Sequence, residues 1–387
     1  MSKIMRLAIV TTHPIQYYAP VFKLLAAKID LMVFYTWGET SLSKHDPGFG
    51  KTIQWDIDLL DGYPYQWLKN TASNAGSHHF SGINNPDLIK QVTNWKPDTI
   101  LFYGWAYRSH LRAMVHFKNK IPVLFRGDST LLDEKPGIKN WLRSVYLRWV
   151  YKHIDYALYT GTRNKAYFKK YGLADRQLVF APHAIDNERF AVDRAEEVQL
   201  FKEQLNINEQ AKIILFAGKL EDKKDPALLL NAFINLAMPN VHLLFVGDGV
   251  LKAALQQQAA AQACVHFVDF KNQSYMPVVY QACDIFCLPS IGPGETWGLA
   301  VNEAMACGKV ILVSDKVGCA VDLVEPGING YISEGGNKID FTEKLQALLN
   351  NSKPELHAMG QVSSQKIASW SFNVQINNMV NLYERHQ

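Results

Sequence analysis

Two carboxylates in a glycine-rich segment are the residues whose types and spacing most directly indicate chemistry. The segment runs Ser290-Ile-Gly-Pro-Gly-Glu-Thr-Trp-Gly-Leu-Ala-Val-Asn-Glu-Ala-Met-Ala-Cys-Gly308, and we expect it to follow a strand and to open a helix near Thr296. Glu303 would then lie about 12 Å from Glu295 at 1.5 Å per residue. Carboxylates accept hydrogen bonds from vicinal hydroxyls, and the free N–H groups of a helix start bind phosphate. The spacing fits a nucleotide-sugar lying from hexose to ribose; a capped helix with a surface glutamate is the alternative.

Three lysines form a second signal earlier in the chain. Gly218 ends an apolar run, and Lys219, Lys223 and Lys224 follow it before a helix that Pro226 opens. Cations at the carboxyl end of a strand neutralise a diphosphate and the charge that develops as it departs. Solvated loop lysines are the alternative interpretation.

Short apolar runs alternate with helical patterns along the whole chain, which indicates an α/β protein built from βαβ units. We expect strands at 6–11, 31–35, 99–103, 123–126, 156–159 and 178–181, and then at 213–217, 242–246, 265–268, 285–288 and 310–313. A polar stretch over 182–194 separates the two series. The pattern predicts two Rossmann-like, doubly wound domains that face each other across a cleft, where ligands of such sheets bind.

Composition restricts the class of protein. Hydrophobic residues make up 48% and charged residues 20% of the 387 residues, which excludes a disordered or fibrous chain. No apolar run approaches the roughly 18 residues that span a bilayer, and no secretory leader is visible, so we expect a cytoplasmic protein. The five cysteines lack the close pairing of a zinc site and are expected to be reduced, buried thiols.

Charge is distributed unevenly between the two halves. Residues 1–190 carry 25 Lys and Arg against 15 Asp and Glu, and ten of these basic residues lie within 135–176. Apolar residues recur there at helical spacing, with basic residues on the other faces; the apolar set is Leu142, Val145, Tyr146, Trp149, Val150 and His153. One interpretation is a core helix with a solvated basic flank. The other is peripheral contact with an anionic membrane, at the inner face of the cytoplasmic membrane. No nucleic-acid-binding module accompanies the charge.

A series of spaced motifs in the second half resembles glycosyltransferase family 4. The motifs are Gly218-Lys-Leu, Leu-Leu-Phe-Val-Gly-Asp-Gly249, Val-His-Phe-Val-Asp-Phe270, Ala282-Cys-Asp-Ile-Phe-Cys-Leu-Pro-Ser290 and Glu295 to Glu303-Ala-Met-Ala-Cys-Gly, and the similarity extends over about 180–372. The resemblance implies the GT-B fold, a nucleotide-sugar donor and retention of anomeric configuration. Trp370-Ser-Phe and the helix after it are similar to the family's last helix, which crosses back to the first domain. The expected domains are therefore 1–190 with 372–387, which binds the acceptor, and 191–371, which binds the donor.

The same resemblance implies roles for individual residues. Glu295 would hold the transferred sugar, Glu303 the ribose hydroxyls, and Lys219 with Lys224 the diphosphate. The remaining residues of the implied donor site are Gly218, Asp269, Phe270, Gly294, Trp297, Gly298 and Leu299. Lys219 stands where the family usually has arginine, which loses bidentate phosphate recognition but keeps the charge. His183 replaces the family's usual asparagine before Ala-Ile-Asp186.

The first half resembles the family only in architecture, so its candidates come from position. His13 follows the first strand with Gln16 behind it, and we expect the histidine to contact acceptor or leaving phosphate, or else to fix its own loop. Arg126 and Asp128 follow the fourth strand. Asp128 would polarise an acceptor hydroxyl, unless it and Arg126 only pair with each other. Gln16, Arg126 and His183 are the acceptor-side candidates.

Two tempting motifs are rejected. Asp56-Ile-Asp58 looks like a metal-binding pair, but it lies far from the nucleotide half and is expected to be a strand entering a turn. Gly247-Asp-Gly249 lacks the third glycine of a dinucleotide fingerprint and follows the second strand of its domain, not the first.

Together these observations predict a retaining, metal-independent glycosyltransferase without a cofactor. It would move a hexose from a UDP-sugar, in preference to a GDP-sugar, to a glycan or lipid-linked glycan in cell-surface polysaccharide synthesis. A binding protein that keeps the site but has lost turnover is the alternative. An epimerase or phosphorylase would need an acid–base pair or a cofactor-anchoring lysine that the sequence does not provide.

Overall fold

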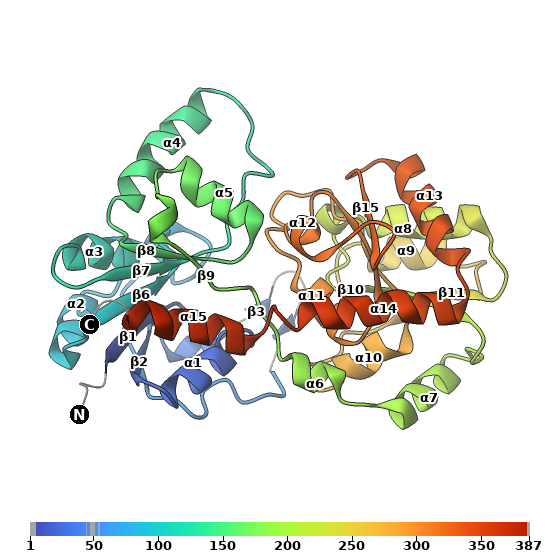
Figure 1. Cartoon of the computed structure of the whole chain (residues 1–387), viewed down its shortest axis with the longest axis horizontal. Coiled ribbons are helices and arrows are strands. Elements are labelled where there is room, and N and C mark those ends of the chain that lie inside the picture. The colour runs from blue at the N-terminus through green and yellow to red at the C-terminus, as the bar shows by residue number, and fades with distance from the viewer. Residues whose placement is uncertain (1–4, 44, 47–50, 53–54, 385–387) are drawn as a thin grey trace. The chain divides into compact units, whose positions relative to one another are not determined.

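The chain folds into two compact α/β units. The computed structural model describes residues 5–43, 45–46, 51–52 and 55–384 (Figure 1). The first unit takes 5–43, 55–182 and 372–384, and the second takes 45–46, 51–52 and 183–371. The division thus falls after Pro182, eight residues before the boundary expected at 190. The reason is that α6 (Asn187–Ala191) packs on α10 (Met276–Ala282) and α11 (Leu299–Ala306) of the second unit.

The first unit is built on a seven-stranded parallel sheet in the order β5-β2-β1-β6-β7-β8-β9. Its strands are β1 (Arg6–Thr11), β2 (Asp30–Tyr35), β5 (Tyr65–Trp67), β6 (Thr99–Tyr103), β7 (Val123–Arg126), β8 (Tyr156–Tyr159) and β9 (Leu178–Phe180). Its helices are α1 (Ala19–Ala26), α2 (Leu88–Trp95), α3 (Arg108–Phe117), α4 (Ile138–Tyr151), α5 (Thr162–Lys170) and α15 (Phe372–Glu384). The central strands are continuous apolar runs because helices cover both faces of a parallel sheet.

The last helix of the chain returns to the first unit. α15 packs on α1 and β9 (Figure 1). Asn378 donates a hydrogen bond from Nδ2 to Phe180 O at 2.9 Å, and Lys28 Nζ donates to Asn377 Oδ1 at 3.0 Å. The expectation that the C-terminal helix crosses back is therefore confirmed.

The second unit has a six-stranded parallel sheet in the order β12-β11-β10-β13-β14-β15. Its strands are β10 (Lys212–Ala217), β11 (Val241–Val246), β12 (Val265–Val268), β13 (Ile285–Leu288), β14 (Val310–Ser314) and β15 (Gly330–Ser333), and a small hairpin pairs β3 (His45–Asp46) with β4 (Lys51–Thr52). Its other helices are α7 (Ala195–Gln204), α8 (Pro226–Leu236), α9 (Lys252–Gln258), α12 (Ala320–Leu323), α13 (Lys338–Leu349) and α14 (Lys353–Ile367).

The sheet architecture is the one predicted, with local corrections. Two strands of the parallel sheets, β5 and β15, were not expected, and neither was the hairpin of β3 and β4. The segment containing Asp56 and Asp58 is a turn without a strand; Asp58 Oδ1 accepts a hydrogen bond from Leu60 N at 2.9 Å. None of the described helices is long and apolar enough to cross a membrane.

The cysteines are free thiols, three of them buried and two half-buried. Burial raises the pKa of the Cys283 thiol to about 12 and raises the pKa of Cys287 as well. These side chains therefore stay protonated and serve as small apolar core residues.

A buried histidine ties the strand ends of the first unit together. His110, on α3, is fully buried; its Nδ1 donates to Gly104 O at 2.9 Å, and its Nε2 lies 2.8 Å from Thr36 Oγ1. Those partners follow β6 and β2. Burial lowers the pKa of His110 to about 4, so the imidazole is neutral in the folded protein.

This histidine predicts a loss of stability in acid. Because the pKa of His110 is lower in the folded chain than in the unfolded chain, the contribution is complete above pH 6.5 and is lost as the pH falls toward 4. The loss is at most about 3 kcal/mol. Denaturant unfolding between pH 7 and 4 should show this slope in the wild type and a shallower one in His110→Gln. The exposed His78→Gln control should keep the wild-type slope. If His110→Gln also shows the wild-type slope, His110 is not the group responsible.

Candidate functional site

The second unit has a topological switch point at β10. From this strand the chain proceeds outward through β11 and β12 on one side and through β13, β14 and β15 on the other. The loops that leave the carboxyl ends of β10 and β13 therefore lie beside each other and diverge, and such crevices bind ligands in open parallel sheets. The first loop carries Lys219 and Lys224, and the second carries Glu295.

The two loops meet in an ion pair. Lys224 Nζ lies 2.7 Å from Glu295 Oε2, with the side chains only 16% and 12% exposed. Ser290 Oγ donates to the same carboxylate oxygen at 3.3 Å. Backbone contacts reinforce the arrangement, since Ile291 N donates to Lys223 O at 2.9 Å and Gly318 N donates to Glu295 O at 3.0 Å. The structure thus brings together two residues that are 71 positions apart in the sequence.

Two glycines after β11 let the loop that follows β10, which carries the lysines, pack closely against them. A Cβ atom at Gly247 would lie 2.1 Å from Gly218 O, and one at Gly249 would lie 2.4 Å from Leu220 O. Leu220 N donates to Asp248 O at 3.0 Å, so backbone packs on backbone there. The Gly-x-Gly motif therefore supports the loop that carries Lys219, which explains it without a dinucleotide.

Helix α11 begins at Leu299, not near Thr296 as expected. Gly298 forms its N-cap with φ +94°, a left-handed conformation that favours glycine, and a Cβ atom there would lie 2.8 Å from Val317 Cγ1. Residues 295–298 are consequently not helical, and the 12 Å helical spacing between the two glutamates does not apply. Val301 N donates to Gly298 O at 2.9 Å, whereas the N–H groups before it have no carbonyl of the same helix to meet.

Glu303 lies on the second turn of α11 and is 4% exposed. Tyr280 Oη, on α10, donates to Glu303 Oε2 at 2.8 Å. A buried tyrosine thus fixes the orientation of this carboxylate, as expected of a group that must be positioned before it meets a ligand.

Trp297 and His183 belong to one buried network behind the α11 start. Trp297 Nε1 donates to Asn302 Oδ1 at 2.9 Å, and Asn302 Nδ2 donates to His183 O at 2.9 Å. The Trp297 ring lies 5.9 Å from the His183 ring and 5.1 Å from the Trp370 ring. With 4% exposure each, Trp297 and His183 act through packing, which holds the α11 start in place.

The other donor-side candidates lie on the surrounding loops. Lys219 and Phe270 are half-buried, while the Asp269 side chain is exposed and pairs with Lys252, which also contacts Asp248 Oδ1 at 2.7 Å. Gly294 has φ +91° with open space where a Cβ atom would point. Leu299 is the first residue of α11.

The candidates of the first unit lie at the ends of β1 and β7, which flank β6 in the sheet. His13 follows β1; its Nδ1 lies 2.8 Å from Thr12 Oγ1, and its ring meets Trp37 edge-on at 5.3 Å. Gln16 lies half-buried in the same turn. Asp128 follows β7. Burial and the nearby Asp128 carboxylate raise the pKa of Tyr18. The Tyr18 and Tyr103 ring centroids lie 4.7 Å apart. Asp128 therefore has a phenol as a neighbour, which the sequence did not indicate.

The Arg126 side chain is buried and bonds to the protein backbone. Its guanidinium donates to Ala181 O at 2.7 Å and to Pro182 O at 3.1 Å, and 3% of the residue is exposed. That burial leaves an acceptor almost no surface to contact. Arg126 instead holds the chain where it leaves β9.

Replacing this arginine should destabilise the first unit. In Arg126→Met, two buried carbonyls lose charge-assisted partners, and we expect a loss of about 2–4 kcal/mol in unfolding free energy. Arg112 is a matched control, because its guanidinium also donates to two carbonyls, Asn85 O at 2.7 Å and Pro86 O at 3.3 Å, from an exposed position. For Arg112→Met, denaturant titration should show a loss of less than about 1 kcal/mol in unfolding free energy. Equal losses would refute the structural role of Arg126.

Several supporting residues could not be predicted from the motifs. Tyr280 lies in an apolar helical pattern that indicates no polar role. Asn302 lies between Glu295 and Glu303, but no motif assigns it a function. Ser290 came closest, since it ends a quoted motif. Among the described residues, no group of three His, Cys, Asp or Glu side chains is placed to hold a metal ion.

Comparisons with known proteins agree with the predicted fold and indicate a glycosyltransferase. Residues 197–365 match the family Glycosyl transferases group 1. The D-inositol 3-phosphate glycosyltransferase of Corynebacterium jeikeium is 26% identical over 215 residues, which cover 52% of this chain and 50% of that protein. The N,N'-diacetylbacillosaminyl-diphospho-undecaprenol alpha-1,3-N-acetylgalactosaminyltransferase of Campylobacter jejuni is 25% identical over 247 residues, which cover 63% of this chain and 64% of that protein. The chain thus matches about half the length of the first of these relatives and less than two thirds of the second.

A solved structure extends the similarity to the whole fold. Anabaena Alr3699/HepE in complex with UDP superposes with a TM-score of 0.72 at 16% identity, covering 99% of this chain and 100% of that one. The predicted GT-B fold is therefore confirmed, and the match of residues 197–365 to the group 1 family agrees with the resemblance to a glycosyltransferase. Membership of family 4 itself stays a prediction.

Proposed function

Residues 197–365 match the group 1 glycosyl transferases, and from that premise we propose that the chain is a retaining glycosyltransferase. It moves a hexose from a nucleotide-diphosphate sugar to a hydroxyl of a glycan or lipid-linked glycan, in the synthesis of a cell-surface polysaccharide.

The observation that carries this proposal is the pair formed by Lys224 and Glu295. The pair lies where the loops after β10 and β13 diverge, at 2.7 Å and largely out of water. A carboxylate there accepts hydrogen bonds from sugar hydroxyls, while a lysine beside it neutralises a diphosphate. Nucleotide-sugars present those two groups side by side, which is why this substrate class suits the site.

Glu303 and the start of α11 complete the donor site. In our proposal the diphosphate lies against the N–H groups that open α11 and against Lys219 and Lys224, and the ribose hydroxyls meet Glu303. These charges neutralise the diphosphate, so the proposed reaction needs no metal ion and no cofactor. Backbone near Asp269 and Phe270 flanks the base.

UDP is the preferred nucleotide. The supporting observation is that a solved structure of similar fold, Anabaena Alr3699/HepE, contains UDP. A lipid-linked acceptor is supported by the Campylobacter relative, whose name describes transfer to a diphospho-undecaprenol sugar. His13, Gln16 and Asp128 are the acceptor-side candidates in the first unit.

The chemical step requires no protein nucleophile. The bond from the anomeric carbon to the diphosphate oxygen breaks as the acceptor oxygen bonds to the same face of that carbon. The acceptor proton passes to an oxygen of the departing diphosphate. Positioning of the reactants and stabilisation of the leaving group supply the acceleration.

Thermal unfolding with a panel of nucleotides tests the proposal. UDP, GDP, ADP and their sugars are added to the full chain in the presence of EDTA. A ligand at 100 times its dissociation constant adds about 2.7 kcal/mol. We expect a rise in Tm with UDP and UDP-hexoses; a rise with another base would revise the donor, and no rise with any ligand would refute the donor site.

A further inference from the structure

Helix α4 carries an apolar surface that the fold does not cover. Six of its large apolar side chains are between 40% and 79% exposed: Ile138, Trp141, Leu142, Val145, Tyr146 and Trp149. Every other helix in the described part of the chain exposes at most one such side chain. The core-helix interpretation of this segment is therefore wrong for most of its apolar residues, since of those expected in the core only Val150 is buried.

The exposed side chains form one stripe. At about 100° per residue they fall within an arc of about 140° on the helix, centred on Ile138, Val145 and Trp149. The opposite face, with Leu147, Val150 and Tyr151, is buried and belongs to the core of the first unit. We call the six exposed residues the α4 stripe.

Basic residues flank the α4 stripe and are not neutralised. Helix α4 contains no Asp or Glu. Around the helix axis, Lys139 lies beyond one edge of the stripe and Arg148 beyond the other. Within the described residues, no ion pair forms at Lys135, Lys139, Arg148 or Lys152.

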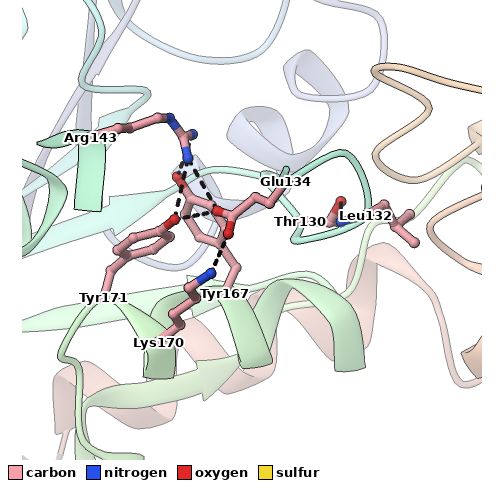
Figure 2. Close-up of polar contacts among 7 residues, drawn as sticks. All are labelled: Thr130, Leu132, Glu134, Arg143, Tyr167, Lys170 and Tyr171. Carbon is pink, nitrogen blue, oxygen red and sulfur yellow. Dashed lines mark hydrogen bonds and ion pairs between the residues drawn. The ribbon is translucent and has the colours of Figure 1, made fainter. Parts of the chain in front are cut away.

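Four neighbouring basic residues, by contrast, form ion pairs. Glu134 contacts Arg143 at 3.2 Å and also Lys170 and the Tyr171 hydroxyl (Figure 2). Asp175 forms ion pairs with Lys165 and Lys169. The uncompensated positive charge of the segment is thus concentrated on and beside α4, next to the apolar stripe.

The same pairs fix the helix on its unit. Arg143 projects from α4 toward Tyr167 of α5 and toward Tyr171, the residue that follows α5 (Figure 2). Glu134, from the loop before α4, contacts Lys170 of α5. The α4 stripe is therefore presented by a helix held in place from its buried side.

We propose that the α4 stripe docks on an anionic membrane surface, with the helix lying flat at the interface. An interfacial helix buries an apolar face among lipids while basic residues at its edges contact anionic headgroups. Trp and Tyr favour that depth, and Trp141, Tyr146 and Trp149 contribute three such rings. A second copy of the chain fits less well, because two stripes face to face would bring like charges together. This docking requires no turnover, so it stands or falls separately from the proposed function.

Co-sedimentation with vesicles tests the docking. The full chain is mixed with vesicles of phosphatidylcholine alone and with vesicles containing 30% phosphatidylglycerol, at low and at 0.5 M salt. We expect binding to the anionic vesicles that weakens at high salt. The charge variant Lys139→Gln/Arg148→Gln and the apolar variant Trp141→Ser/Leu142→Ser should each weaken binding about tenfold or more.

A matched control comes from the second unit. Lys338→Gln/Ile339→Ser removes an exposed lysine and an exposed isoleucine from α13, and it should bind vesicles like the wild type. An unchanged Tm without any ligand would show that the α4 variants are folded. Absence of binding to anionic vesicles, equal loss in the α13 control, or a dimer in sedimentation that the Trp141→Ser/Leu142→Ser variant abolishes would each overturn the proposal.

Discussion

Glu295→Gln should lower kcat about 10²- to 10³-fold while changing nucleotide affinity little. The glutamine keeps the size of the side chain but removes the charge that pairs with Lys224 at 2.7 Å. In the proposed site this carboxylate contacts the sugar, and a lost preorganised electrostatic contact typically costs that much in turnover. The measurement is the release of UDP from a UDP-hexose in the presence of acceptor, at saturating donor.

A matched control separates this effect from the loss of any ion pair. Asp340 pairs with Lys344 at 2.6 Å on α13 of the same unit, and the two side chains are 27% and 29% exposed. Asp340→Asn should leave kcat within about twofold of the wild type. A Glu295→Gln enzyme that turns over like this control would remove Glu295 from the reaction.

Glu303→Gln should raise the dissociation constant of the nucleotide about 10- to 100-fold. Glutamine still offers Tyr280 an oxygen to accept its hydrogen bond, so the fold loses little, but the ligand loses a charged acceptor for its ribose hydroxyls. Hydrogen bonds to charged groups contribute about 1.5–3 kcal/mol, which corresponds to that range. Calorimetric titration with UDP measures it.

Tyr280→Phe tests how Glu303 is positioned. The substitution removes the 2.8 Å bond to Glu303 Oε2 and leaves the carboxylate in place. We expect a smaller loss of nucleotide affinity, below about tenfold, because the bond acts on the ligand only through Glu303. If Glu303→Gln binds UDP as tightly as the wild type, the ribose assignment is wrong whatever Tyr280→Phe does.

Periodicity predicted the sheets well because each central strand is an apolar run with a turn signal at its end. β1, β6, β7, β8, β12 and β13 have the predicted bounds. β15 was missed because Gly330 opens a run of only four residues. The structure explains that glycine, since a Cβ atom there would lie 1.9 Å from Ile311 O.

The sequence also located the candidate donor residues, but not their environment. The Lys224–Glu295 contact joins two loops whose adjacency depends on strand order, which no local pattern encodes. The burial of Glu303 depends on Tyr280, a residue of another helix. The start of α11 was misplaced because Gly298, not a polar side chain, forms its N-cap.

Helix α4 shows where amphipathic patterns fail. The spacing of Leu142, Val145 and Trp149 correctly indicates one face of a helix. It does not indicate whether protein covers that face. The sheet packs instead against Leu147, Val150 and Tyr151, and the more obvious stripe remains exposed.

Calorimetric titration of UDP into the full chain and into Lys224→Met, both in EDTA, tests the central claim most directly. The account predicts one UDP per wild-type chain without metal, and affinity at least about tenfold weaker in Lys224→Met, because the charge beside Glu295 is lost. No heat of binding in the wild type, or equal affinity in the variant, would contradict a nucleotide-sugar site at the loops after β10 and β13.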